Sequence, residues 1–152
     1  MRLSEYTDYT LRVLMYGAVH RHRLVTIGEL AEHHGLSKNH LMKVVNDLAR
    51  QGLIETVRGR GGGLRLALAP EQIRIGDVVR AAETDFRLVE CFDAHTDRCT
   101  LTRSCRLQHL FHGAMQAFFE TLDAATLADV VAAPAPAVRV VRPPRPRRTP
   151  TP

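Results

Sequence analysis

The sequence has no apolar run near the roughly 20 residues that a membrane-spanning helix needs. Its first nine residues also lack the apolar stretch of a secretion signal, because Glu5 and Asp8 fall within them. The composition therefore excludes a membrane protein. We expect a cytoplasmic protein that does not associate with a membrane.

Aromatic and sulfhydryl residues are also scarce. Tryptophan is absent, and five Phe and three Tyr among 152 residues allow one modest core in a compact domain with extensions. There are three cysteines, Cys91, Cys99 and Cys105, and they fall within fifteen residues. An odd number of thiols in a cytoplasmic protein argues against a disulfide framework, since thiols there stay reduced.

The net charge of +5 is unevenly distributed along the chain. Residues 37–65 carry six basic and two acidic residues, whereas residues 66–133 carry six basic and ten acidic ones. A basic block of this kind favours an anionic partner. Residues 134–152 contain five Arg, no acidic residue and most of the prolines, and we expect this tail to be disordered.

The N-terminal part of the chain has the pattern of a helix-turn-helix. We expect a first helix over residues 4–21 and a second that begins at Thr26, in a capping box with Glu29, and ends at Gly35. Ser37 is a plausible N-cap for a third helix. Apolar stripes at helical spacing support the first and third helices: Leu11, Leu14, Met15 and Ala18, then Leu41, Val44, Val45 and Leu48.

Polar residues cluster at the start of the third helix, where recognition helices contact base edges in the major groove. The candidate DNA-binding residues there are Ser37, Lys38, Asn39, His40 and Lys43. On spacing alone, a simple solvated helix face is an equal alternative. The segment that follows shifts the balance towards DNA.

That segment predicts a β-hairpin with a glycine-rich tip. Residues 53–57 are β-prone, and Leu64, Leu66 and Leu68 alternate with other residues as in a strand. Between them, Arg58 and Arg60 stand among four glycines, so the arginines can approach DNA phosphates closely. A nucleotide-binding P-loop would need a Lys-Ser/Thr pair and a following helix. The combination predicts a winged helix.

The C-terminal part predicts a cysteine-bearing loop and a long helix. We expect a short helix at residues 76–83, a loop over 84–104, and a helix from Cys105 to Asp123. The apolar stripe of the long helix is wide: Leu107, Leu110, Phe111, Ala114, Met115, Phe118, Phe119 and Leu122. Packing inside a small core would explain part of it. We favour dimerisation, because a winged-helix monomer has little else to bury such a face against.

The Cys-x7-Cys-x5-Cys spacing suits a metal or an iron–sulfur cluster, because thiolates are soft ligands. The gaps are wider than the two to four residues usual in zinc knuckles. A fourth ligand could come from His95, His109, His112 or an oxygen atom. Unligated or redox-active thiols, a thiol-dependent enzyme and a winged helix that binds protein are the alternatives. The enzyme lacks an evident orienting carboxylate, so we do not expect catalysis.

The chain also resembles the winged-helix iron–sulfur repressors of the Rrf-two type, most closely their nitric-oxide-sensing branch. The matching stretches, in order, are residues 1–9, 36–41, 57–64, 75–79, 88–92 and 126–130. The resemblance implies a homodimer that binds a double-stranded DNA operator. It also implies a 4Fe–4S cluster held by Cys91, Cys99 and Cys105, with Asp8 of the partner subunit as the fourth ligand.

Cluster-assembly regulators of the same family instead use a histidine three residues after the third cysteine. Gln108 occupies that position here, and His109 follows it. This departure favours the nitric-oxide-sensing branch over a regulator that senses cluster supply or redox state through a 2Fe–2S cluster. We thus expect a winged helix-turn-helix at 1–69, a cluster loop and dimerisation helix at 70–133, and the tail at 134–152.

Overall fold

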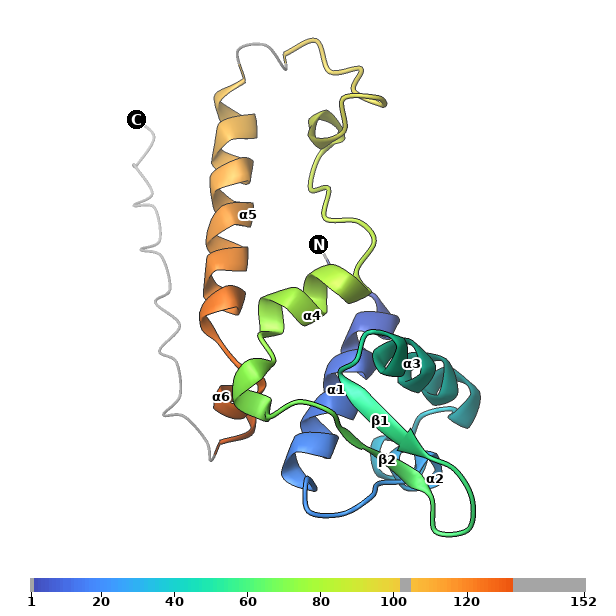
Figure 1. Ribbon diagram of the computed structural model, residues 1–152. Coiled ribbons are helices and arrows are strands. Elements are labelled where there is room, and N and C mark those ends of the chain that lie inside the picture. The colour runs from blue at the N-terminus through green and yellow to red at the C-terminus, as the bar shows by residue number, and fades with distance from the viewer. Residues whose placement is uncertain (1, 102–104, 133–152) are drawn as a thin grey trace, which may run out of the picture.

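The computed structural model describes residues 2–101 and 105–132, so the predicted tail at 134–152 lies outside the described residues. Over these residues the protein is mainly helical, with one two-stranded antiparallel hairpin (Figure 1). The elements are α1 (Glu5–Val19), α2 (Ile27–His34), α3 (Lys38–Arg50), β1 (Ile54–Val57), β2 (Gly63–Leu66), η1 (Pro70–Gln72), α4 (Ile75–Ala82), η2 (Glu90–Phe92), α5 (Arg106–Ala124) and α6 (Leu127–Val131). The predicted winged-helix fold is confirmed. None of the described helices is long and apolar enough to cross a membrane.

The helix ends follow local capping rules with two differences from expectation. Thr26 caps α2 by accepting a hydrogen bond from Glu29 N at 3.1 Å. The carboxylate of Glu29, however, binds the Arg23 guanidinium and the Tyr16 hydroxyl, so the reciprocal half of the predicted capping box is wrong. Gly35 ends α2 at φ 66° as expected, whereas Ser37 precedes α3 without a side-chain capping bond.

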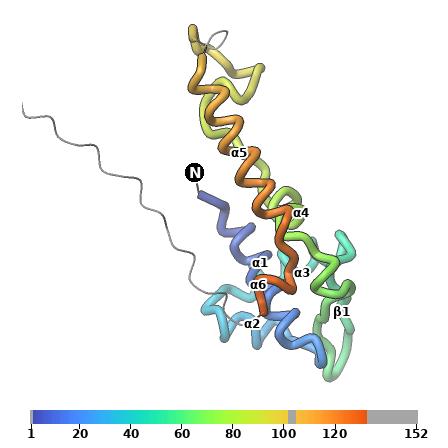
Figure 2. Tube along the Cα trace, turned by 90° about the vertical axis from the view of Figure 1, so that its left-hand side faces the viewer, coloured from blue at the N-terminus to red at the C-terminus, as the bar shows by residue number. Residues whose placement is uncertain are grey.

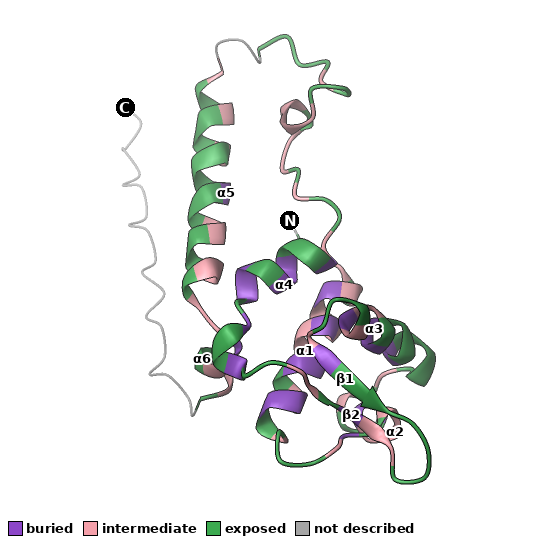
Figure 3. Ribbon diagram, in the orientation of Figure 1, coloured by how far each residue is buried: buried purple, intermediate pink, exposed green. Residues whose placement is uncertain are grey.

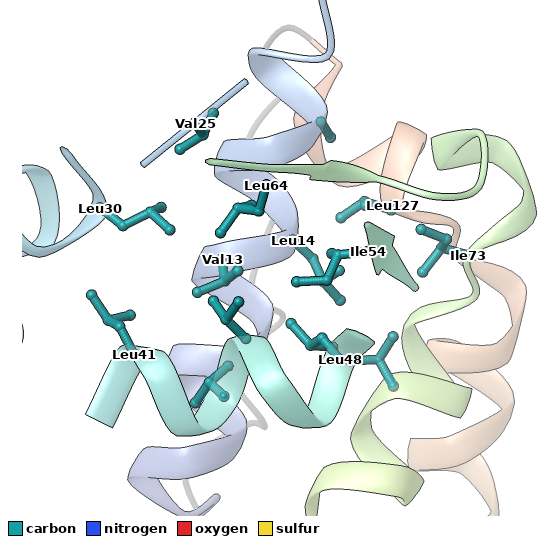
Figure 4. Close-up of a cluster of buried hydrophobic side chains, with 14 of the residues drawn as sticks. Val13, Leu14, Val25, Leu30, Leu41, Leu48, Ile54, Leu64, Ile73 and Leu127 are labelled. Atoms are coloured by element: carbon teal, nitrogen blue, oxygen red, sulfur yellow. The ribbon is translucent and has the colours of Figure 1, made fainter. Parts of the chain in front are cut away.

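One hydrophobic core joins the elements (Figure 4). Its fully buried side chains come from α1, the α1–α2 loop, α2, α3, the hairpin and the C-terminal segments: Val13, Leu14, Val25, Leu30, Leu41, Val44, Val45, Leu48, Leu64, Ile73, Val79 and Leu127. The buried face of α1 differs from the predicted stripe, because Met15 is 39% exposed while Thr10 and Val13 are buried. The buried face of α1 is therefore rotated by about one residue from the predicted stripe, and the two share Leu14 and Ala18.

The hairpin is tied to the body by backbone bonds. Ile54 pairs with Leu66 and Val57 with Gly63, and Val25 forms an isolated bridge to Leu64. Gly63 has to lack a side chain, since a Cβ there would lie 2.6 Å from the Val25 carbonyl oxygen. The hairpin is therefore fixed against the α1–α2 loop at the end of its ladder next to the turn, while residues 58–61 of the turn are exposed.

The short helix α6 was not predicted. Thr126 and Asp129 form its capping box, Leu127 is fully buried, and Leu127 N donates to Ile73 O at 2.7 Å. This contact draws residues beyond position 70 into the core of the winged helix. Helix α5 instead extends away from the body, with the segment that carries η2 beside it (Figures 1 and 2).

Candidate DNA-binding surface and cysteine segment

The start of α3 presents a continuous polar surface. Five predicted residues are all exposed there: Ser37, Lys38, Asn39, His40 and Lys43. Below them, Leu41, Val44 and Leu48 are buried and fix the helix against α1 and α2. Because the Ser37 hydroxyl makes no capping bond, it and the first amides of α3 can still bind an acceptor. The end of a rigid helix with exposed donors is suited to the major groove.

The hairpin tip carries the other two predicted DNA-binding residues. Arg58 and Arg60 are exposed on either side of Gly59, which has φ 100°, and Gly61 at φ 80° follows Arg60. Arg65 differs from them, because it is paired across the hairpin with Glu55 at 2.8 Å. Among the described residues, no carboxylate lies within ion-pair distance of Arg58 or Arg60. Both guanidinium groups can therefore meet a phosphate without breaking an existing pair.

Two tyrosines of α1 contact α3, and sequence analysis did not find them. Tyr6 Oη donates a hydrogen bond of 2.6 Å to Asp47 Oδ2, and burial raises the pKa of Tyr6, so the phenol stays protonated as a donor. Tyr9 stacks on His40 with ring centroids 6.4 Å apart. Their i, i+3 spacing places both rings on one side of α1 and is the signal that could have identified them.

Asp8 lies between these two tyrosines in sequence and stands at the surface. Its carboxylate pairs with Arg12 at 2.6 Å, one turn further along α1, and the two side chains are 48% and 43% exposed. The pairing of an acidic residue with a basic one four positions later is a standard helix contact that the sequence could have revealed. An exposed carboxylate in such a pair can exchange its partner at little cost.

Cys91 and Cys99 lie in the cysteine segment, residues 84–101, which runs beside α5, and Cys105 stands at the start of α5. Cys91 belongs to η2, Cys99 lies in the loop that follows, and Cys105 is the N-cap residue of α5. Burial raises the pKa of Cys91, and so do Asp97, Cys99 and Cys105.

Side-chain contacts hold the cysteine segment against α5. Gln108 Nε2 donates to the Cys91 carbonyl oxygen at 3.2 Å, so Gln108 links α5 to η2. The rings of Phe92 and His112 are stacked, with centroids 4.2 Å apart and an interplanar angle of 5°. Within the segment itself, Arg87 forms ion pairs with Asp85 and with Asp93 at 2.7 Å each. The segment is therefore positioned without any disulfide among the described residues.

The donor chemistry of this segment fits an iron–sulfur cluster. Three thiols within fifteen residues supply the soft ligands that such clusters use. Within residues 2–101 and 105–132, however, no three His, Cys, Asp or Glu side chains already stand at metal-binding positions. The candidate histidines His95 and His109 are both exposed. The geometry thus leaves the ligand set a prediction.

The N-terminal half of α5 is mostly exposed (Figure 3), and some of its exposed residues are large and apolar. Leu107 is 53% and Leu110 66% exposed, whereas Met115 is buried and Phe119 packs edge-on against Phe86. The wide predicted stripe therefore divides into two parts. Its C-terminal part packs against this chain, and its N-terminal part has no cover among the described residues.

Comparison with known proteins identifies the family to which this chain belongs. The Rrf2 family, described as an iron-dependent transcriptional regulator, matches residues 3–133. The chain belongs to the Rrf2 family. It is a transcriptional regulator and not an enzyme, as the sequence predicted.

Curated Rrf2-type relatives are similar over most of their length. The HTH-type transcriptional regulator NsrR of Bacillus subtilis strain 168 is 49% identical over 132 residues, which cover 86% of this chain and 90% of the relative. NsrR of Bacillus licheniformis is 47% identical over 132 residues, covering 86% and 92%. The predicted resemblance to this branch of the Rrf2 family is confirmed.

Solved structures of Rrf2-type fold support the same architecture. Staphylococcus aureus CymR in its oxidized form superposes with a TM-score of 0.71 at 24% identity, over 90% of this chain and all of that one. IscR of T. potens gives 0.67 at 26% identity, covering 90% and 94%. The CymR likeness shows the fold alone.

Proposed function

We propose that this Rrf2-family protein is a repressor that binds a double-stranded operator as a homodimer, under the control of an iron–sulfur cluster that reacts with nitric oxide. The main support is that one chain combines a DNA-binding surface with a cluster of cysteines. A winged helix exposes basic and polar residues at α3 and the hairpin tip, and three thiols lie in the cysteine segment beside α5 and at the start of α5. The similarity to proteins named NsrR supports the choice of signal.

DNA binding is assigned to two groups of residues with different roles. Ser37, Lys38, Asn39, His40 and Lys43 contact the major groove from the start of α3. Arg58 and Arg60 contact phosphates from the hairpin tip. Phosphate contacts supply affinity without sequence preference, whereas the helix supplies the preference.

The cluster is assigned to Cys91, Cys99 and Cys105 of one subunit and to Asp8 of the other. A second copy is needed because α1 lies beside α3 and α4, whereas η2 and the loop after it extend along α5 away from the body (Figure 1). The exposed Leu107 and Leu110 provide an apolar face for that second copy. When bound, the cluster supplies the iron that nitric oxide attacks.

The residues of this chain connect that event to DNA. Asp8 must release Arg12 to bind across the dimer, and its attachment then fixes the first two turns of α1 in the assembly. Helix α1 packs against α3, so the two recognition helices of the dimer are held at one spacing. Half-sites lie about one helical turn or a multiple apart, so loss of the attachment mismatches both contacts together.

An anaerobic absorption spectrum with iron and sulfide counts, recorded before and after nitric oxide, tests the cofactor. The proposal predicts four iron and four sulfide atoms per chain and bleaching by nitric oxide. Two of each would favour the alternative, a same-fold regulator of cluster supply or redox state with a 2Fe–2S centre. Cys91→Ala, Cys99→Ala and Cys105→Ala should each abolish the chromophore, and full iron content in any of them would remove that residue from the ligand set.

Asp8 is tested against a neighbour in the same helical turn. Asp8→Ala should change the spectrum of the loaded protein, alter its rate with nitric oxide and lower operator affinity. Glu5→Ala removes a carboxylate with a similar effect on the helix dipole, worth about 0.3–1 kcal/mol, and should leave all three unchanged. Wild-type behaviour in the Asp8 variant would show that its carboxylate serves only the helix dipole.

A further inference from the structure

The first turn of α1 forms hydrogen bonds on two sides. One side contacts Glu83, just before the cysteine segment, and the other contacts the recognition helix α3. Glu83, which follows the last residue of α4, accepts hydrogen bonds from Ser4 N at 2.9 Å and Thr7 Oγ1 at 2.7 Å through one carboxylate oxygen. These bonds lower the pKa of Glu83, with the Ser4 amide as the largest cause. On the other side, Tyr6 donates to Asp47 of α3 at 2.6 Å.

The Tyr6–Asp47 bond is the point where this end of α1 holds α3. A cavity of about 640 Å³ lies on one side of Tyr6, lined also by Lys43, Asp47 and Arg50. A second cavity of about 200 Å³ lies between Tyr6, Tyr9, His40 and Lys43. The two cavities leave the outer side of Tyr6 without close packing, although Tyr6 also borders the core. A short hydrogen bond, partly shielded from water, therefore adds a directional contact between α1 and α3 beyond the buried core.

We propose that Tyr6 is a positioning residue that transmits the state of the cluster from α1 to the recognition helix through Asp47. The inference rests on the proposed function, because Asp8 is the residue through which the cluster would act on α1. Asp8 lies in the same helical turns as Tyr6, and a helix moves as a rigid body over that length. A shift of these turns thus moves the Tyr6 hydroxyl and the α3 residue that it holds.

The N-terminal end of α3, opposite Asp47, is also in contact with α1. Tyr9 stacks on His40 in the first turn of α3, while Asp47 lies near its C-terminus. Tyr6 and Tyr9 thus contact the two ends of the recognition helix from neighbouring turns of α1. A tilt of α1 therefore changes the angle at which α3 enters the major groove as well as how deeply it enters. That angle determines which base edges the first residues of α3 reach.

The test uses Tyr6→Phe, which removes only the hydroxyl. Tyr16→Phe is the matched control, because the Tyr16 hydroxyl also belongs to α1 but donates to Glu29 of α2 at 2.8 Å. The quantity measured is the ratio of operator affinities of the cluster-loaded and cluster-free full-length protein. Tyr6→Phe should lower this ratio by roughly 2- to 30-fold, and Tyr16→Phe should leave it unchanged.

Two variants of the acceptor separate coupling from simple destabilisation. Asp47→Asn keeps an oxygen that accepts the Tyr6 bond and should retain most of the wild-type ratio, whereas Asp47→Ala should lower it as Tyr6→Phe does. Arg50→Ala removes only the exposed ion pair that Arg50 makes with Asp47 and should have no effect on the ratio. Equal losses in the Asn and Ala variants would overturn the assignment to this hydrogen bond.

Amide hydrogen exchange in the cluster-free protein gives an arm that needs no cofactor. Tyr6→Phe should speed exchange in the second half of α3, and unchanged rates would show that the bond does not hold the helix. A wild-type affinity ratio of one would overturn the proposed function and the coupling with it. A wild-type ratio above one that Tyr6→Phe leaves intact would overturn this inference alone.

Discussion

Arg80 donates two hydrogen bonds to the carboxylate of Asp123, from Nη1 to Oδ1 and from Nη2 to Oδ2, at 2.6 Å each. The same guanidinium lies 4.3 Å from the ring centroid of Phe119, and the bonds lower the pKa of Asp123. Helix α4 is thereby joined to the last turn of α5. Because α5 extends away from the body, this two-point contact sets the direction in which α5 leads towards the cysteine segment.

Gly76 is the residue that gives this junction its room. A Cβ at position 76 would overlap Oδ1 of Asp123, so Gly76→Ala must displace the carboxylate from Arg80. We expect a loss of about 1–3 kcal/mol in unfolding free energy, measured by chemical denaturation. Gly28→Ala is the control, because its Cβ would meet only ordinary contacts at 3.8–4.0 Å, and it should raise stability by about 0.5 kcal/mol. Equal effects of the two changes would refute the steric argument.

Arg60 is expected to act through phosphates. Arg60→Ala should weaken binding to operator and to unrelated DNA alike and reduce the slope of log affinity against log salt by about 1. Arg65→Ala is the matched control in the same hairpin, since Arg65 is already paired with Glu55. Titrations at several salt concentrations would count against the assignment if both variants changed the slope equally.

Asn39 and His40 are expected to supply sequence preference instead. Each alanine variant should cost about 1–3 kcal/mol at particular operator base pairs and little on unrelated DNA. The measurement is operator affinity across a set of single-base-pair changes. An unchanged preference profile in both variants would exclude these side chains from base contacts.

Leu110 tests the predicted dimer. Because this side chain is 66% exposed in the isolated chain, Leu110→Glu should leave the monomer folded while it shifts sedimentation or light scattering towards monomer. Val57→Glu places the same charge on an apolar residue of the hairpin that is 44% exposed, and should leave the mass unchanged. A dimeric Leu110 variant would place the interface elsewhere on the chain.

Local signals made much of this fold predictable. Gly35 and Thr26 mark the ends of α2 through bonds made within a few residues, and alternation at 64–68 revealed the second strand. Helix α6 was missed, since five residues are too few to display a helical period. Met15 was assigned to the wrong face, because the buried polar Thr10 occupies the centre of the true one.

The parts that relate the two halves could not be predicted from sequence patterns. Tyr6 and Asp47 are 41 positions apart, and Ser4 and Glu83 are 79 apart, so no periodicity connects them. The predicted cysteine and Asp8 ligands depend on a second subunit and a cofactor. Local sequence identifies such residues by type, whereas their convergence on one cluster remains a prediction about the dimer.

The central claim is tested most directly by one titration. Operator affinity of the cluster-loaded, full-length protein is measured anaerobically while nitric oxide is added in known ratio to the cluster, with iron and sulfide counted in the same sample. The account predicts tight binding at the start and a loss of affinity in step with the bleaching of the chromophore. Full operator affinity after complete bleaching, or equal affinity in protein that never held a cluster, would contradict it.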